Sequence, residues 1–392
     1  MKKCNIFIPR NIYSIYLILS KKKYVDQDDY ILINNHQSYA RKFPKEIISF
    51  LKNKNFKIIF IDKSLTLKSY EYVQNNTFKR FLTKLSLGSL NHTFREISKI
   101  NYEEFNTIEF SKYKNVNIYY GSDLLYYSKL CKNLKNINLY FLEHGAGNFL
   151  NMINDCKIYE KNIKLLIMNV IRYFFFRIKG VHIPYFIYYF GILGCVLDIR
   201  KLEYDYFRIK FLRANLERGV EQLYNFYEKK LIILKKKEKS NYIFLNIPYH
   251  YDLKTFKKYL DYVCKRVKLK KNSIVLTNIH TGYQEHEYIN ILLKTLKLYK
   301  INSKLLSRKS PNFPAEIVMK YFNVKEIYSG YSTILFSSFY LFRKNLQINV
   351  IFSNSIAKKY KHLSELNQFS TEFIKNNFLN KNIDFIDLDL IN

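Results

Sequence analysis

The sequence predicts an α/β protein with two Rossmann-like domains that face a cleft. Short apolar runs alternate with amphipathic segments of helical length, which is the pattern of parallel sheets built from βαβ units. The pattern occurs twice, with a different region between the two occurrences. A chain of 392 residues is too long for one ordinary core and long enough for two. A hydrophobic content of 48% and an aromatic content of 17% exclude extended disorder.

The first half contains five apolar runs that we expect to be buried parallel strands. These runs are Asn5–Pro9, Tyr30–Asn34, Lys57–Asp62, Val116–Tyr120 and Ile137–Leu142. The second half repeats the pattern with four more expected strands, at Tyr242–Ile247, Ser273–Thr277, Glu326–Tyr328 and Gln347–Phe352. Helices such as Leu253–Arg266 and Glu287–Leu298 are expected between them.

The region between the two halves contains a long apolar run, Ile183–Leu197. Its fifteen residues are fewer than the roughly 20 that span a bilayer, so we expect a buried helix. A basic-flanked aromatic surface that rests on a membrane is the alternative. Tyr204–Lys239 is expected to be helical. We therefore expect Rossmann-like domains at 1–205 and 241–392, joined by a helical linker at 206–240.

Charge is the most unusual property of the composition. Lys and Arg total 65 against 32 Asp and Glu, a formal charge of +33, which favours an anionic partner such as a membrane surface or an acidic polysaccharide. A lysine-rich but functionally neutral surface is the alternative. Nucleic acid is not expected, because the sequence contains no zinc-finger spacing, helix-turn-helix signature or aromatic RNA-binding pattern.

The cysteines and the first residues bear on the cellular compartment. Five scattered cysteines without a CxxC pair favour a reducing cytoplasm over a disulfide framework or a zinc site. The amino terminus is basic and apolar, as in a signal peptide, but Pro9 and Arg10 interrupt the apolar stretch and no small-residue cleavage site follows. We expect a strand followed by a helix there.

Ligands of doubly wound sheets bind beyond the carboxyl ends of the strands, so the loops at those ends are the candidate sites. Glu143 directly follows the expected strand Ile137–Leu142 and precedes His144 and Gly145. A carboxylate there can accept a proton from a hydroxyl, and glycine lets the backbone approach a substrate. The alternative is a tight turn in which Glu143 caps the next helix.

Two further loops carry suitable side chains in the second half. His280 follows Ser273–Thr277 and can donate to a phosphate, although a structural histidine is the alternative. Ser329, Gly330, Ser332 and Thr333 follow Glu326–Tyr328 and open an apolar helix. Hydroxyls at a helix N-terminus form a phosphate site, although Ser332 can also be a simple N-cap.

The order of these three loops resembles the bacterial sialyltransferases and polysialyltransferases of the GT-B fold. Glu143-His144-Gly145 resembles their acidic-acidic-Gly motif, with His144 in the second acidic position. His280-Thr281 resembles their His-Pro motif, with threonine replacing proline, and Ser332-Thr333 matches their Ser-Ser or Ser-Thr motif. Phe313-Pro314-Ala315-Glu316 resembles their Pro-Ala-Glu helix start.

The resemblance implies an inverting transferase with a CMP-activated sugar acid, typically CMP-sialic acid, as donor. Glu143 is then the general base on the acceptor hydroxyl, in an acceptor-side first domain. His280 assists the departing phosphate. Donor binding falls to the set Gly145, His280, Glu316, Ser329, Gly330, Ser332 and Thr333. No metal or other cofactor is implied. The acceptor is a glycan or a polyanionic polysaccharide of a capsule or lipooligosaccharide.

Two alternatives remain open at this point. The first is a CDP-glycerol or CDP-ribitol phosphotransferase of surface-polymer synthesis, which would use His144 as a catalytic histidine. The second is a non-catalytic polysaccharide assembly protein, which would need neither Glu143 nor His280 for catalysis. For the transferase, the charge and the absence of a signal peptide predict a cytoplasmic protein bound peripherally to the inner face of the bacterial membrane.

Overall fold

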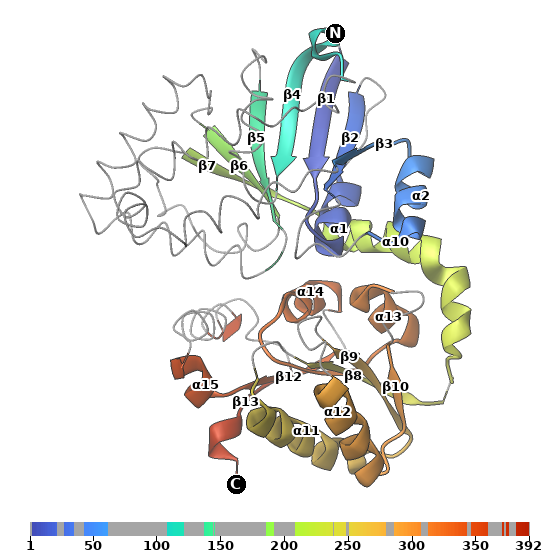
Figure 1. Ribbon diagram of the computed structural model, residues 1–392, viewed down its shortest axis with the longest axis vertical. Helices are drawn as coiled ribbons and strands as arrows, with labels where there is room; N and C mark the ends of the chain where they lie inside the picture. The colour runs from blue at the N-terminus through green and yellow to red at the C-terminus, as the bar shows by residue number, and fades with distance from the viewer. Residues whose placement is uncertain are drawn as a thin grey trace, which may run out of the picture. The chain divides into compact units, whose positions relative to one another are not determined.

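The computed structural model contains two parallel α/β units (Figure 1). It describes residues 2–21, 27–34, 43–61, 108–120, 137–143, 145, 186–191, 208–237, 239–247, 251–279, 286–306, 313–342, 346–359, 371, 374–375 and 382–391. The first unit comprises Met1–His144 and Asn151–Asn215, and the second comprises Gly145–Leu150 and Leu216–Asn392.

The first unit is built on a seven-stranded sheet in the order β3-β2-β1-β4-β5-β6-β7, and every recorded strand pair is parallel. The strands are β1 (Lys2–Ile8), β2 (Gln27–Asn34), β3 (Lys57–Ile61), β4 (Tyr113–Tyr120), β5 (Ile137–Leu142), β6 (Phe186–Gly191) and β7 (Arg208–Arg213). The helical segments described with them are α1 (Ile12–Ser20), α2 (Lys45–Asn53) and η2 (Phe110–Lys112).

The second unit has a six-stranded parallel sheet in the order β10-β9-β8-β11-β12-β13. Its strands are β8 (Asn241–Ile247), β9 (Ser273–Ile279), β10 (Ser303–Leu305), β11 (Glu326–Ser329), β12 (Gln347–Phe352) and β13 (Ile383–Asp387). Its helices are α10 (Leu216–Leu231), η5 (Ile232–Leu234), α11 (Leu253–Lys268), α12 (His286–Leu298), α13 (Ala315–Phe322), α14 (Thr333–Leu341), α15 (Asn354–Lys359) and η6 (Leu388–Leu390).

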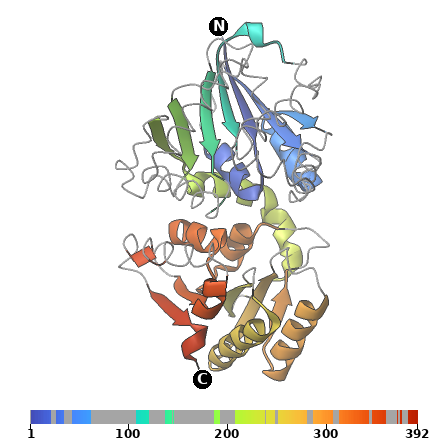
Figure 2. The same cartoon turned by 60° about the vertical axis from the view of Figure 1, so that its left-hand side comes forward.

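Helices pack in pairs on the second sheet. In both views α11 lies beside α12, and α13 packs against α14 and α10 (Figures 1 and 2). Counted within its own unit, the second sheet has the strand order 3-2-1-4-5-6, which is the order of Rossmann-type sheets, and the first sheet has the same order with a seventh strand beyond the sixth. The direction of the order reverses between β1 and β4 in the first sheet and between β8 and β11 in the second. These two pairs of strands form the switch points at which such sheets bind ligands.

The predicted fold class is confirmed, and all nine predicted strands occur within three residues of their expected bounds. The wrong assignments are two predicted helices in the middle of the chain. Phe186–Gly191, inside the run expected to be a buried helix, is strand β6. Its aromatic and β-branched residues suit a strand between β5 and β7.

The expected helix Tyr204–Lys239 is also wrong in its first part, because Arg208–Arg213 forms β7 at the edge of the first sheet. Its sequence alternates basic and apolar residues (RIKFLR), which is the period of a strand, and basic side chains are common on edge strands. The helix α10 begins only at Leu216. In the part of the chain that the structure describes, no helix has the length and apolarity needed to cross a bilayer.

A row of polar side chains crosses the centre of the first sheet. Asp29, Asn5, Asn117 and Asn138 are register partners on β2, β1, β4 and β5. Asn5 donates to Asp29 at 2.7 Å, Asn117 donates to Asn5 at 2.9 Å, and Asn138 donates to Asn117 at 3.0 Å. Lys21, just after α1, donates to Asn5 at 2.8 Å. The row therefore satisfies its buried amides from strand to strand.

A second row, two residues further along β1, β4 and β5 and continued on β6, is aromatic. Phe7, Tyr119, Tyr140 and Tyr188 stack in sequence with ring centroids 4.7, 4.3 and 4.8 Å apart. The Lys21 ammonium lies 4.6 Å from the Tyr119 ring centroid, so it contacts both rows. Burial lowers the pKa of Lys21 to about 8, although nearby Asp29 partly opposes this shift.

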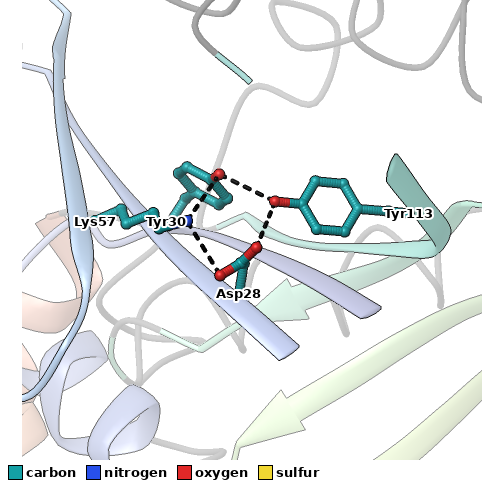
Figure 3. A network of polar contacts seen from close by, with 4 residues as sticks. All are labelled: Asp28, Tyr30, Lys57 and Tyr113. Carbon is teal, nitrogen blue, oxygen red and sulfur yellow. Dashed lines mark hydrogen bonds and ion pairs between the residues drawn. The ribbon is translucent and has the colours of Figure 1, made fainter. Parts of the chain in front are cut away.

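A compact polar network closes the amino-terminal edge of the first sheet (Figure 3). Tyr113 donates to Asp28 at 2.6 Å, and Lys57 pairs with the same carboxylate at 3.1 Å. The Tyr113 hydrogen bond is the main reason that the pKa of Asp28 is lowered. Tyr30 lies within hydrogen-bond distance of both Tyr113 and Lys57. The lysine at this edge is thus neutralised by a carboxylate.

Lys21 gives the first unit a specific pH dependence. Its folded pKa of about 8 lies below its ordinary value of 10.5, so between these values the unfolded chain binds more protons than the folded chain. The free energy of unfolding should therefore rise with pH in this window. Relative to Lys21→Met, the wild type should gain about 2 kcal/mol between about pH 7.5 and about pH 10.

Urea unfolding followed by circular dichroism measures this difference. Lys52→Met, which removes an exposed lysine of α2, is the matched control and should run parallel to the wild type. If the Lys21→Met and wild-type stabilities stay parallel over the same pH range, the assignment of a lowered Lys21 pKa is wrong.

Candidate active site

Glu143 lies at the carboxyl end of β5 and is completely buried. Its backbone N–H donates to the carbonyl of Phe190 at 3.1 Å, which continues the pairing of β5 with β6 past the last strand residue. The side chain is therefore fixed to the central part of the first sheet, at the edge where ligands of parallel sheets bind.

Two tyrosine hydroxyls satisfy the Glu143 carboxylate. Tyr13 donates to Oε1 at 2.6 Å, and Tyr189 donates to Oε2 at 2.5 Å. Tyr13 lies in the first turn of α1 and Tyr189 lies on β6, so the carboxylate joins two elements that are far apart in sequence. A buried carboxylate requires such donors, because an unpaired charge away from water is very costly.

The amino-terminal cap of α1 also positions side chains against Glu143. The Asn11 side chain caps the helix by accepting from the backbone N–H of Ser14 at 3.1 Å. The Ser14 hydroxyl lies 3.3 Å from the Glu143 carbonyl oxygen and 3.2 Å from Asn11 Oδ1, and can donate to either. The cap therefore sets where α1 begins and brings Tyr13 to the carboxylate.

Gly191, the last residue of β6, leaves the space that Glu143 occupies. A Cβ atom added at Gly191 would lie 2.1 Å from Glu143 Oε2 and 2.7 Å from Glu143 Cβ. Both distances are far inside van der Waals contact, so any larger residue at position 191 must displace the carboxylate. The glycine requirement here is steric and does not involve unusual backbone angles.

The second unit places a polar cluster at its switch point. Asn246 on β8 and Ser329 on β11 are register partners, and the Asn246 amide donates to the Ser329 hydroxyl at 2.9 Å. The same amide nitrogen donates to the Ser332 hydroxyl at 3.0 Å. Asn278 on β9 donates to the Asn246 carbonyl oxygen at 3.1 Å. We call Asn246, Asn278, Ser329 and Ser332 the switch-point cluster.

The hydrogen bonds of the switch-point cluster determine where the Ser332 hydroxyl proton points. Ser329 donates to the Gly330 carbonyl at 2.8 Å, so its own proton is committed. The two serine oxygens lie 3.2 Å apart, and Ser332 is then the donor in this contact. An incoming oxyanion would compete for that proton. The cluster thus presents a hydroxyl donor rather than only acceptors.

Ser332 occupies the N-cap position of α14 but its side chain makes no capping hydrogen bond. Its hydroxyl is held by Asn246 instead, and its carbonyl accepts from Leu335 N–H at 3.1 Å. The alternative that Ser332 is a simple side-chain cap is therefore not what the structure shows. A helix N-terminus without a side-chain cap favours a bound anion.

Gly145 approaches the start of α14, within the second unit. Its φ is +146°, a conformation that L side chains rarely adopt, and a Cβ added there would lie 2.7 Å from Thr333 Oγ1. Backbone geometry and space therefore both require glycine at this position. The backbone at Gly145 consequently lies close to the Thr333 hydroxyl.

The remaining predicted donor-side residues have structural partners. Glu316, in the first turn of α13, is buried and accepts from Ser337 of α14 at 2.8 Å, so it ties these two helices together. Tyr331, which is not one of the predicted donor-side residues, hydrogen-bonds with Thr371, and burial raises its pKa to about 12. Gly330 is buried between the two serines of the switch-point cluster.

His280 and His144 lie outside the described residues, so their predicted roles stay predictions. The structure groups Ser329, Gly330, Ser332 and Thr333 in the second unit, with Gly145 close to Thr333, while Glu143 belongs to the first unit. Each group occupies the carboxyl-terminal edge of its own sheet.

Sequence reasoning missed five residues of these two groups: Tyr13, Tyr189, Gly191, Asn246 and Asn278. Three of them carried a signal, since an amide or a glycine inside an otherwise apolar strand is unusual. The two tyrosines carried none, because tyrosine is abundant throughout the chain, with 36 copies.

Comparison with known proteins identifies the fold. No protein-family model matches the chain, and no curated protein sequence matches it. A 2,6-sialyltransferase from Photobacterium sp. JT-ISH-224, solved in a ternary complex with CMP and lactose, matches with a TM-score of 0.54 at 13% identity. The match covers 98% of this chain and 78% of that protein.

Other solved structures match less well. A sialyltransferase from Photobacterium damsela has a TM-score of 0.47 at 11% identity, with 98% of this chain and 81% of that one covered. A UDP-GlcNAc 2-epimerase from Methanocaldococcus jannaschii has a TM-score of 0.43 at 12% identity, with 99% and 89% covered. At these identities the comparisons bear on the fold alone, and the match to the JT-ISH-224 enzyme, with the two parallel sheets, shows that this chain has two Rossmann-like units of the GT-B fold class.

The contact between Gly191 and Glu143 predicts a large effect of one methyl group. Gly191→Ala should lower the free energy of unfolding by about 1–3 kcal/mol, because the added Cβ overpacks a rigid interior. Chemical denaturation measures the loss. In a Glu143→Gly background the same change should cost much less, since the atoms it meets are gone. An equal loss in both backgrounds would show that the Gly191 requirement has another origin.

Proposed function

We propose that this protein is an inverting glycosyltransferase that uses a CMP-activated sugar acid of the sialic-acid type. The observation that carries the proposal is the switch-point cluster, where Ser332 presents a donor beside an N-terminus of α14 that has no side-chain cap. This arrangement suits the phosphate of a nucleotide donor. The sialyltransferase of the same fold with bound CMP supports a cytidine nucleotide as the donor.

In the proposed reaction an acceptor hydroxyl attacks the anomeric carbon of the donor sugar. Glu143 takes the hydroxyl proton as the new carbon–oxygen bond forms, and the bond to the phosphate breaks on the opposite face, which inverts the configuration. CMP leaves with the bonding electron pair. Ser332 and Thr333 donate to its phosphate oxygens, and His280 hydrogen-bonds or protonates the phosphate. Donors aimed at growing negative charge stabilise the transition state.

The environment of Glu143 adds a condition to this mechanism. Each carboxylate oxygen already accepts from one tyrosine hydroxyl, so the acceptor hydroxyl must reach a second lone pair of Oε1 or Oε2 to transfer its proton. The tyrosines then act as positioning residues that hold the carboxylate in place. The proposal includes no metal or cofactor, and the leaving phosphate receives hydrogen bonds from protein donors.

A second candidate follows from the same burial. A buried carboxylate that is held by two hydroxyls also suits a residue that orients a neighbouring catalytic histidine. In that case the protein is a CMP-releasing phosphotransferase of the CDP-glycerol or CDP-ribitol type, with His144 as the base. Incubation with labelled CMP-sialic acid, CDP-glycerol and UDP-sugars, with CMP release scored, distinguishes the donors.

The acceptor and the location are part of the proposal. We propose a glycan or polyanionic surface polysaccharide as acceptor, and a peripheral position on the inner face of the cytoplasmic membrane. The formal charge of +33 supports both, since each of these partners is anionic.

The two candidates differ in which residue of the Glu143–His144 pair is the base. If the protein transfers sialic acid, Glu143→Gln should reduce transfer by about 10²–10⁴-fold and leave donor binding nearly intact, because the amide cannot accept a proton. His144→Ala should be milder. Initial rates with the donor that releases CMP measure both. An enzyme that loses more activity with His144→Ala than with Glu143→Gln would exclude the sialyltransferase assignment.

The donor phosphate should bind the second unit. Replacing Ser332 and Thr333 together by alanine should weaken CMP binding about 100-fold, since two hydrogen bonds to a charged phosphate are lost. Isothermal titration calorimetry with CMP measures the affinity. The matched control, Thr295→Ala with Ser355→Ala, removes the same two hydroxyl types from α12 and α15 and should leave the affinity unchanged. Equal affinities in both double variants would refute this donor site.

A further inference from the structure

The second unit has a hollow of about 550 Å³ at the amino-terminal edge of its sheet. It is formed around the starts of β8, β9 and β10. The described residues that line it before these strands are Lys237, Lys239, Ser240, Val267, Lys268, Lys270, Asn272 and Tyr299–Asn302. Because all strands of the sheet are parallel, this edge is the one opposite to the edge that carries the switch-point cluster. The hollow is thus separate from the proposed donor site.

Lysine dominates the lining of this hollow. Lys237, Lys239, Lys268, Lys270 and Lys300 line it, and none of the described residues around it is acidic. Lys270 is paired with Glu326, whereas the other four are exposed and have no carboxylate within ion-pair distance among the described residues. We call this feature the lysine hollow.

The positive charges near the lysine hollow are close enough to affect one another. Lys304, on β10, donates to the backbone carbonyls of Leu234 and Lys235 at 2.6 and 2.7 Å. Burial lowers the pKa of Lys304, and the nearby charges of Lys237 and Lys235 lower it further. Unneutralised like charges held together cost free energy, and a bound anion would remove that cost.

Uncharged polar groups complete the lining. Ser273, the first residue of β9, lines the hollow, and its hydroxyl is a buried group without a hydrogen-bond partner in the described part of the chain. Such groups are rare in folded proteins and call for an explanation. Asn272 and Asn302 lie beside it. The lining therefore combines cations with hydrogen-bond donors, as oxyanion sites do.

The equivalent edge of the first sheet shows the contrast. There Lys57 is neutralised by Asp28 and the network is closed by Tyr113 (Figure 3). Lysines also occur at helix C-termini because they complement the helix dipole, and Lys268 ends α11 in this way. That explanation does not cover Lys237 and Lys239, which precede β8 and end no α-helix.

We propose that the lysine hollow is a binding site for a phosphate-bearing anion, either the headgroup of an anionic phospholipid or a soluble phosphate ester. The volume is in the range of small-molecule sites, and lysines bind phosphate as mobile point charges. Two nearby lysines can also chelate one multivalent phosphate. The site does not depend on the transferase activity proposed above, since it lies at the other edge of the sheet.

The test compares two triple variants in a Ser332→Ala, Thr333→Ala background, so that the proposed donor site does not contribute. The hollow variant carries Lys239→Gln, Lys268→Gln and Lys300→Asn; asparagine is used because Lys300 has a φ of +56°, which asparagine tolerates. The control carries Lys254→Gln, Lys257→Gln and Lys358→Gln, which removes three exposed charges outside the hollow. All six lysines are exposed, so both variants should fold, as circular dichroism can verify.

Inorganic pyrophosphate is titrated by calorimetry, and vesicles of phosphatidylcholine with or without phosphatidylglycerol are sedimented with each protein. The hollow variant should lose about ten-fold in affinity for pyrophosphate, for phosphatidylglycerol vesicles, or for both, while the control changes little. Loss on the vesicles identifies a lipid headgroup as the source, and loss on pyrophosphate alone identifies a soluble ester. Three results would overturn the proposal. The first is an equal loss of affinity in the hollow variant and the control, and the second is that the protein binds neither pyrophosphate nor the vesicles. The third is that polyglutamate competes with the bound probe as well as pyrophosphate does, because the site would then bind any polyanion.

Discussion

A carboxylate that is removed from water has to receive hydrogen bonds, and in the first unit Glu143 imposes this demand on helix α1 and strand β6 at once. Helix α1 supplies Tyr13, strand β6 supplies Tyr189, and Gly191 leaves the volume that the side chain fills. The Asn11 cap fixes where α1 begins, which decides whether Tyr13 can reach. The position of the Glu143 side chain, the volume it occupies and its hydrogen bonds therefore depend on the same few residues.

The second unit meets a related demand with neutral groups. Asn278, Asn246 and Ser329 pass hydrogen bonds across three adjacent strands, and the last link holds the Ser332 hydroxyl at the start of α14. Because these hydrogen bonds already hold the Ser332 hydroxyl in place, little ordering of this side chain is needed when a ligand binds. The two opposite edges of this sheet differ in kind, since one carries oriented hydroxyls and the other carries lysines.

Nine of the thirteen described strands could be predicted because a strand buried on both faces needs a continuous apolar run, and such runs are visible in the sequence. The two edge strands of the second sheet, β10 and β13, were not predicted. Two misassignments have one cause: the apolar content of β6 and the alternating pattern of β7 lie within longer stretches that also fit a helix. Glu143 and Ser332 could be selected as candidates because they lie in the loops that follow predicted strands. Tyr13 could not be found, since its role depends on a contact across 130 residues of sequence.

The polar row of Asp29, Asn5, Asn117 and Asn138 has a consequence for how the first sheet assembles. A strand that slides by one residue turns every side chain to the opposite face. A strand made only of apolar residues tolerates such an error, because the residue that replaces each side chain in the interior is also apolar. Here, a shift of β1 by one residue would separate Asn5 from all its partners and leave its side-chain amide without hydrogen bonds. The row therefore disfavours sheets with the wrong register during folding. This effect is separate from the row's net contribution to the stability of the native fold.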